Sequence, residues 1–282
     1  MGVVGAGRVG AVLGAALQLA GHEVVATSAV SEASRSRAAD LLPGVPVLPV
    51  DDVVRAADLV LLTVPDDALA ELVSGLAATG AFRRGSLVAH TSGRHGLAVL
   101  EPAGGLPLAL HPVLPFGGTR VDLHRLHGTA FGVTAPDSLR PIAEALVVEM
   151  GGEPIWLTEA QRPLWHAALA HGANHLTTLV ASSADLLRTA GVENPGQVLG
   201  PLLGAALDGS LRVGDAALTG PVARGDAGTV RAHLEVLAQV APEVLPSYVA
   251  MARLTADRAI ASGRLDPDRA WALLDVLGSV PR

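Results

Sequence analysis

The chain has 282 residues, of which 50% are hydrophobic and 17% charged, and its formal net charge is −7. It has no Cys, which excludes disulfides and thiolate chemistry, and every basic residue is Arg, which excludes a Schiff base or a lysine general acid. No signal-peptide pattern, membrane-length apolar run or basic stripe occurs. We therefore expect a cytoplasmic protein of two domains, with no nucleic-acid or membrane partner.

The first predicted strand leads into Gly5-Ala6-Gly7-Arg8-Val9-Gly10, and an Ala- and Leu-rich helix follows to Ala20. A strand, Gly-x-Gly-x-x-Gly and a helix, in this order, form the dinucleotide-binding fingerprint. We expect Gly5 to make the tight turn, Gly7 to admit a pyrophosphate and Gly10 to allow close helix packing. The helix N-terminus would face the phosphates. A weaker alternative is that the motif binds no dinucleotide.

The second predicted strand, residues 22–27, ends where an Asp or Glu usually binds the free ribose 2′-hydroxyl of NAD. This chain has Ser28 there, followed by Ser31, Arg35 and Arg37. Small hydroxyls and guanidinium groups suit a 2′-phosphate, because charge-assisted hydrogen bonds to phosphate are strong. The sequence thus predicts NADP(H) as cofactor, and a solvated helix start is the alternative.

Further strand-like segments alternate with helices up to residue 157, at residues 45–50, 58–64, 86–90, 106–110, 129–134 and 153–157. Buried apolar strands separated by helices predict an α/β domain over residues 1–157, with a doubly wound, mostly parallel sheet of the Rossmann type. Ligands bind such sheets at the carboxyl ends of the strands. The residues expected along this edge are Gly5–Gly10, Ser28, Thr63, Val64, Pro65, Asp66, His90, Thr91, Ser92, Gly93 and His111. A capping role for His90 is an alternative to a catalytic one.

An all-α domain is predicted over residues 158–282. Its first helix would run from Thr158 to about Ala190, and further helices lie near residues 197–208, 226–240, 243–262 and 266–277, with Asp226 and Asp266 as N-caps. Between two of these helices stands LTGPVARGD, residues 218–226. Its glycines and proline around Arg224 suit an ordered loop that holds an anion, or simply a turn that Asp226 caps.

Together these motifs resemble a family of Rossmann-like oxidoreductases with a helical C-terminal domain of unknown function. The family lies in the superfamily of 6-phosphogluconate dehydrogenase, ketopantoate reductase and pyrroline-5-carboxylate reductase. The segments that carry the resemblance are GAGRVG (5–10), TVPD (63–66), HTSG (90–93), His-Pro (111–112), WHAALAHGAN (165–174) and LTGPVARGD (218–226). The resemblance implies NADP(H) binding and a homodimer formed through the C-terminal helical domain.

Related reductases use a lysine and, one turn later, an asparagine on the first helix of the second domain. Asn174 matches that asparagine, but Ala170 stands in the lysine position, and His166 is the predicted replacement as proton donor. At 100° per residue His166 and Asn174 share a stripe of small residues, whereas Leu169, Leu176, Leu179 and Val180 form a predicted core stripe. Ordinary packing is the alternative for His166 and Asn174.

His171 and His175, at i,i+4, fall outside that stripe and are expected on a solvated or interface face. Two histidines do not make a metal site, since catalytic zinc needs three protein ligands, and no metal is expected.

These residues predict an NADPH-dependent oxidoreductase that reduces a C=O or C=N bond of a small carboxylated metabolite, either a 2-oxo acid or a cyclic imine. His166 would supply the proton, Asn174 and Ser92 would orient the carbonyl, and His111 would contact the substrate. Arg224, reaching across a dimer interface, would bind its carboxylate. A non-catalytic NADP(H)-binding sensor or assembly protein is the alternative, since the chain has no lysine.

Overall fold

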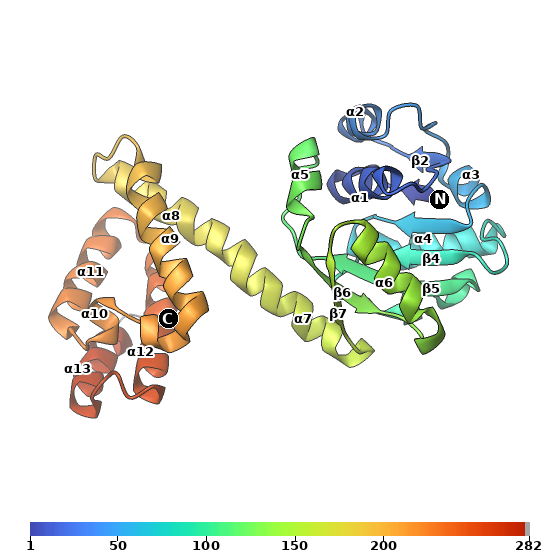
Figure 1. Cartoon of the computed structure of the whole chain (residues 1–282). Coiled ribbons are helices and arrows are strands. Elements are labelled where there is room, and N and C mark those ends of the chain that lie inside the picture. Colours follow the sequence, from blue (N-terminus) through green and yellow to red (C-terminus); the bar gives the residue numbers. More distant parts are fainter. Residues whose placement is uncertain (280–282) are drawn as a thin grey trace. The chain divides into compact units, whose positions relative to one another are not determined.

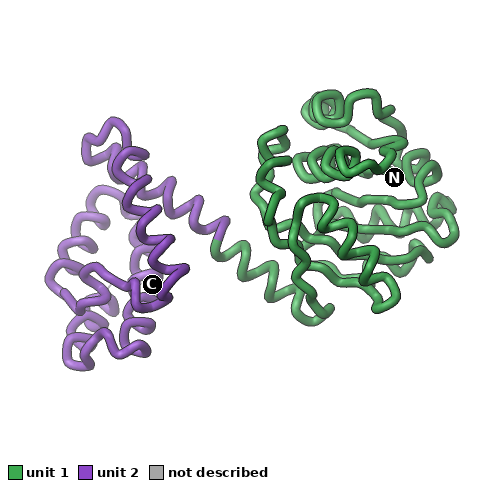
Figure 2. The backbone as a smooth tube through the Cα atoms, in the orientation of Figure 1, with its two compact units in different colours: residues 1–172 green, residues 173–282 purple. Residues whose placement is uncertain are grey.

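The computed structural model describes residues 1–279, which form two compact units, 1–172 and 173–279 (Figures 1 and 2). The predicted boundary at residue 157 separates the sheet from the helices, whereas the division between compact units follows Gly172. No helix among the described residues is long and apolar enough to cross a membrane.

The first unit contains a seven-stranded sheet in the order β2-β1-β3-β4-β5-β6-β7. All neighbouring strands are parallel except β5 and β6, which are antiparallel. The predicted doubly wound, mostly parallel sheet is therefore confirmed. The strands are β1 (Gly2–Val4), β2 (Ala26–Ser28), β3 (Leu59–Leu62), β4 (Leu87–His90), β5 (Leu106–Pro112), β6 (Ala130–Thr134) and β7 (Glu153–Trp156).

Helices cover both faces of this sheet (Figure 1). One apolar core joins one face to α1, α2 and α6, and a second joins the other face to α3, α4 and a 3-10 helix at Leu97–Ala103. Two such cores explain why the strands are apolar on both sides. The helices of this unit that precede α7 are α1 (Arg8–Leu19), α2 (Glu32–Leu41), α3 (Val50–Arg55), α4 (Asp66–Ala78), α5 (Arg120–Arg125) and α6 (Arg140–Glu149), with 3-10 turns at Asp137–Leu139 and Glu159–Gln161.

The predicted strand at residues 45–50 is wrong. Only Val47 bridges to Thr27 there, and Val50 already begins α3. Pro46 and Pro49 explain the difference, because a proline has no N–H group to donate to a strand ladder.

The long helix predicted from Thr158 to Ala190 is interrupted. It consists of α7 (Arg162–Leu169), a π-helical turn (Ala170–Asn174) and α8 (His175–Thr189). The angle of 100° per residue therefore does not hold between His166 and Asn174, since a π-helical turn contains more residues than an α-helical one.

The second unit is helical, as predicted. An apolar core lies between α10 (Gly220–Ala223), α11 (Ala227–Val240), α12 (Leu245–Ala261) and α13 (Pro267–Gly278). The other helix, α9 (Pro195–Val213), packs against α8 and is followed by a 3-10 turn at Gly214–Ala217. Asp226 and Asp266 are N-caps, as predicted, and accept hydrogen bonds from the N–H groups of Thr229 and Asp268.

The core stripe predicted on α8 is wrong, because no residue of α8 is buried. Leu176 and Leu179 are 42% and 48% exposed. Their apolar face is therefore open to solvent in the single chain.

Candidate functional site

The fingerprint loop has the geometry that its three glycines predict. Gly5 has φ +94°, a conformation that favours glycine. A Cβ atom on Gly10 would collide with the Gly5 carbonyl and Thr63 Oγ1, whereas a Cβ on Gly7 would meet nothing within 4 Å. Gly5 thus makes the tight turn, Gly10 allows the close helix packing, and open space lies beside Gly7.

The N-terminus of α1 is free to bind an anion. Its N-cap, Gly7, has no side chain to accept a hydrogen bond, and the first turn contains no acidic residue. The N–H groups of the first helical residues, Arg8, Val9 and Gly10, lack intrahelical acceptors, as in any α-helix. Together with the helix dipole they favour a phosphate here.

Thr63 was predicted at this edge of the sheet, but its role as a support of the loop was not. Its Oγ1 donates to the carbonyls of Val4 and Gly5, at 3.0 and 2.6 Å. The signal was present in the sequence, since Thr63 follows the apolar strand β3 at the carboxyl edge of the sheet, beside the fingerprint.

The serines and arginines after β2 have different surroundings. Ser28 is buried, and its Oγ accepts a hydrogen bond from the Gly5 N–H at 2.9 Å, so it supports the fingerprint turn. Ser31 is the N-cap of α2. Arg35 is exposed and donates to the Val30 carbonyl. Neither Arg8 nor Arg35 forms an ion pair with any residue between 1 and 279, which leaves both cations available to an anion.

Val64, Pro65 and Thr91 follow β3 and β4, at the same edge of the sheet as the fingerprint. Val64 is partly buried and Pro65 is the exposed N-cap of α4. Thr91 continues the parallel ladder, because its N–H donates to the Leu62 carbonyl at 3.3 Å.

His90 is a buried clamp for the loop that follows β4. Its Nδ1 accepts from the Ser92 N–H at 3.1 Å, so in the neutral ring Nε2 carries the hydrogen and donates to the Gly96 carbonyl at 2.9 Å. Burial lowers the pKa of His90 from 6.5 to about 4, with smaller contributions from the Arg162 and His95 charges in the same direction. This geometry matches the capping alternative for His90.

Replacing His90 is expected to make the fold less sensitive to acid. The pKa of His90 is depressed on folding, so the unfolded chain takes up the proton first and stability falls as the pH falls from 6.5 towards 4. Between pH 7 and pH 4.5, His90→Gln should lose roughly 2–3 kcal/mol less unfolding free energy than the wild type. Urea unfolding at both pH values measures this, with exposed His124→Gln as a control for loss of a histidine. If His90→Gln lost as much unfolding free energy between pH 7 and pH 4.5 as the wild type does, the role of His90 in holding this loop would be refuted.

Ser92 lies within this loop rather than on its surface. It is 6% exposed, and its Oγ accepts from the His95 N–H at 3.1 Å. The Leu97 N–H donates to Glu159 Oε1 at 2.6 Å, and Arg94 pairs with Asp67 at 2.8 Å. The loop between β4 and the following 3-10 helix is therefore held by its own hydrogen bonds and by contacts with Glu159 and Asp67.

His111, Trp165 and His166 meet beside this loop. Trp165 Nε1 donates to His111 Nδ1 at 3.0 Å, and the His111 and His166 rings lie edge to face with centroids 5.9 Å apart. A Cβ on Gly93 would lie 2.6 Å from His166 Cδ2 and 2.9 Å from His111 Nε2. Two predicted site residues, His111 and His166, are thus brought together on the side of Gly93 that has no side chain.

Arg162 lies beneath this cluster and is 0% exposed. Its guanidinium donates to the Ser92 carbonyl at 2.5 Å, the Thr134 hydroxyl at 3.0 Å and the Gly132 carbonyl at 3.4 Å. It forms no ion pair with residues 1–279, and its Nε has no partner among them. Desolvation lowers the pKa of Arg162 from its ordinary value to about 10, so it remains a buried cation at neutral pH.

Arg162 and Trp165 were both missed as site residues. Each lies within one helical turn of His166, the residue that the sequence did select, and Trp165 stands within the WHAALAHGAN motif itself. Their partners, however, belong to the loop after β4 and to the β5–β6 pair, which helical spacing does not reveal.

Asn174 and Arg224 belong to the second unit. Asn174 ends the π-helical turn, and Arg224 is the exposed C-cap of α10. The Arg224 side chain forms no ion pair within residues 1–279. His171 and His175 are exposed on either side of Asn174.

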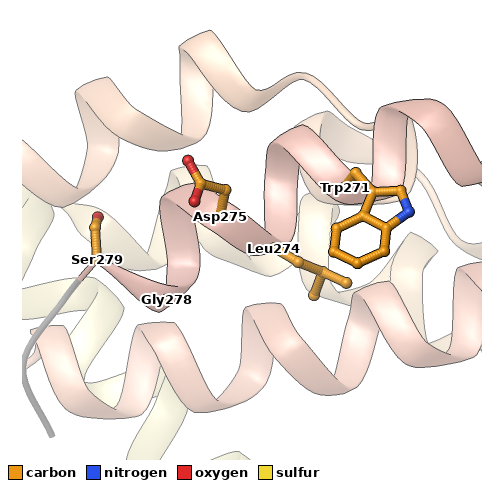
Figure 3. A pocket seen from close by; sticks show the side chains of 5 residues that line it. All are labelled: Trp271, Leu274, Asp275, Gly278 and Ser279. Atoms are coloured by element: carbon orange, nitrogen blue, oxygen red, sulfur yellow. The ribbon is translucent and has the colours of Figure 1, made fainter.

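No group of three His, Cys, Asp or Glu side chains placed to bind a metal occurs among the described residues. A shallow hollow on α13 is lined by Trp271, Leu274, Asp275, Gly278 and Ser279, and Figure 3 shows their side chains. It contains none of the predicted site residues.

The Rossmann-like domain matches residues 1–112, and a domain of unknown function, DUF2520, matches residues 129–255. No protein of curated function matches the sequence.

Several solved structures share the fold over most of the chain. A candidate NADP oxidoreductase from Bacteroides fragilis is 23% identical over 90% of this chain and 96% of its own, with a TM-score of 0.79. Imine reductase from Pseudomonas sp. is 17% identical over 98% of both chains (TM-score 0.64). Pyrroline-5-carboxylate reductase from Streptococcus pyogenes is 15% identical over 92% of this chain and 96% of its own (TM-score 0.61).

Proposed function

We propose that this chain, which carries a Rossmann-like domain followed by a DUF2520 domain, is an NADPH-dependent reductase in the superfamily of 6-phosphogluconate dehydrogenase and pyrroline-5-carboxylate reductase. Its substrate would be a small carboxylated metabolite with a C=O or C=N bond. The observation that carries the proposal is the pairing of His111 with His166 beside Gly93, in the same unit as an intact dinucleotide fingerprint.

The residues of the fingerprint fit a nicotinamide dinucleotide. The open space beside Gly7 and the uncapped N-terminus of α1 suit its pyrophosphate. Ser31 and Arg35 would bind the 2′-phosphate. Val64, Pro65 and Thr91 would border the cofactor at the ends of β3 and β4. When bound, the cofactor supplies hydride.

His166 has the proton-transfer role in this proposal. It is partly buried, packs against Gly93 and lies edge to face with His111. Histidine is the most frequent general acid in enzymes, and His166 would protonate an oxygen or nitrogen that gains negative charge as hydride arrives. Lysine is absent from the chain, so this function falls to another side chain.

Ser92 is the third residue of the proposed site in the first unit, and the roles of Asn174 and Arg224, which belong to the second unit, stay predictions from the sequence. The Ser92 hydroxyl accepts one hydrogen bond and keeps its own hydrogen to donate. Asn174 would orient the acceptor group, and Arg224 would bind a carboxylate as a bidentate fork.

Arg35→Ala is expected to weaken NADPH binding about tenfold and to leave NADH binding unchanged, because the guanidinium would contact only the 2′-phosphate. Titrations that follow nicotinamide fluorescence measure both dissociation constants. Arg55→Ala is the matched control, since Arg55 is an exposed arginine on α3 that already pairs with Asp51. Equal losses for NADPH and NADH would contradict the proposed 2′-phosphate site.

A homodimer through the helical domain is part of the proposal. It is supported by large apolar side chains that α8 and α9 leave exposed in the single chain. They are Leu176, Leu179, Val198, Leu202, Leu207 and Leu211. The molecular mass of the protein in solution, measured by light scattering, tests the homodimer.

NADPH consumption by the wild type, over a panel of 2-oxo acids and cyclic imines, tests the reductase proposal. We expect at least one panel member to be reduced. Tight NADPH binding with no consumption over the whole panel would favour the alternative, a non-catalytic NADP(H)-binding sensor or assembly protein.

A further inference from the structure

The hydrogen bond from Trp165 fixes which nitrogen of His111 carries the proton. An indole N–H can only donate, so His111 Nδ1 must accept, and the hydrogen of the neutral imidazole is on Nε2. Nε2 has no hydrogen-bond partner among residues 1–279. His111 therefore offers one N–H group, in a known position, to a ligand.

Trp165 is held in place by β6. Gly132 pairs with His111 across the antiparallel β5–β6 ladder, and a Cβ on Gly132 would lie 2.9 Å from Trp165 Nε1. Arg162, one turn before His166 on the same helix, donates to the carbonyl of Gly132. The indole thus lies over a glycine, and a buried guanidinium anchors its helix to that same strand.

The Nε2 side of His111 packs against Gly93, next to His166. Nε2 is 2.9 Å from the position of a Cβ on Gly93, and His166 Cδ2 is 2.6 Å from that same position. The N–H donor and the proposed acid therefore lie side by side against the same glycine.

We propose that His111 binds the oxygen of the substrate through Nε2–H, that Trp165 is the positioning residue for this contact, and that the acceptor is consequently a carbonyl, as in a 2-oxo acid, rather than an iminium. This inference rests on the proposed reductase function. The carbonyl carbon takes the hydride from NADPH and forms a C–H bond. The π electron pair moves to oxygen, which takes a proton from His166, and the hydroxy acid leaves. His166 then recovers a proton from water.

The charges around His111 favour this chemistry. Burial lowers the pKa of His111 from 6.5 to about 4, helped by the charges of Arg162 and His166 and opposed by Asp66. At neutral pH the ring is thus an uncharged donor, and proton transfer is left to His166. The buried Arg162 charge stabilises negative charge that develops on an oxygen, whereas it repels an iminium cation, which also has no lone pair to accept the Nε2–H group.

Two substitutions at His111 separate hydrogen-bond donation from packing and from acid catalysis. His111→Phe keeps a ring but has no donor, and we expect kcat for a 2-oxo acid to fall about 10²–10³-fold. His111→Gln has an amide N–H near the position of Nε2 and cannot act as an acid, so its loss should stay within about tenfold. NADPH affinity should change in neither variant, and His124→Phe, at an exposed position on α5, is the control. Equal losses of kcat in His111→Phe and His111→Gln, or no loss in His111→Phe, would overturn the role of His111 as a hydrogen-bond donor.

The tautomer is read independently of turnover by long-range ¹H–¹⁵N NMR on the full chain with labelled histidine. The His111 signal, assigned by its absence in His111→Gln, should show the hydrogen on Nε2 at pH 7. In Trp165→Phe the titration midpoint of His111 should rise by roughly half to one pH unit, because the indole N–H no longer bonds the unprotonated Nδ1. A hydrogen on Nδ1 in the wild type, or an unchanged midpoint in the variant, would refute the positioning role.

The acceptor class is tested with a matched pair, a 2-oxo acid and a cyclic imine of the same carbon number. We expect kcat/KM to be at least about 100-fold higher for the 2-oxo acid, and a higher value for the imine would overturn the carbonyl assignment. If neither compound is reduced, the reductase proposal fails, while the NMR result still decides the tautomer.

Discussion

Gly93→Ala is expected to lower kcat/KM at least about 100-fold and to leave the fold and the NADPH affinity intact. A Cβ at this position would lie 2.6 Å from His166 and 2.9 Å from His111, so both rings must move. His111 cannot move without losing its hydrogen bond to Trp165. A displacement of about 1 Å in a catalytic group commonly costs about 100-fold in rate.

Steady-state reduction of the 2-oxo acid by purified Gly93→Ala measures this loss, together with an NADPH titration and a thermal unfolding curve. Gly75→Ala on α4 is the matched control, since a Cβ there would meet nothing within 4 Å. Wild-type turnover in Gly93→Ala would show that the two rings do not border the reacting atoms.

His166→Gln is expected to lower kcat about 10²–10⁴-fold, the range that a positioned general acid contributes. Glutamine keeps a polar side chain of similar length but cannot exchange a proton, so NADPH binding and the fold should persist. Single-turnover NADPH oxidation with a saturating 2-oxo acid measures the chemical step without product release.

The exposed His124→Gln controls for loss of a histidine outside the site. An activated iminium substrate needs less help from an acid, so any residual imine reduction should fall less than reduction of the 2-oxo acid. Equal turnover by His166→Gln and the wild type would assign the proton to another group.

The nucleotide-binding half of the fold was predictable because its signals are local. The positive φ of Gly5 and the collision that any side chain at Gly10 would cause follow from a short glycine motif between a strand and a helix. The error at residues 45–50 was also local, since the two prolines there argued against a strand.

The site was only partly predictable. His111 and His166 were selected because one ends a strand and the other stands in a motif, but the contact between them depends on α7 packing near β5 and β6. The buried position of Arg162 could not be predicted either, because its hydrogen-bond acceptors are 28 to 70 residues away in the sequence. The π-helical turn gave no periodic signal, and the apolar face of α8 imitated a core stripe although it is exposed.

Hydride transfer to a carbonyl carbon can be followed with NADPH that carries deuterium at its transferable position. We expect the wild type to place one deuterium on the former carbonyl carbon of a 2-oxo acid, detected by mass spectrometry and NMR of the hydroxy acid. If NADPH binds but keeps its label, with every acceptor in the panel recovered unchanged, the protein is not a reductase of these substrates.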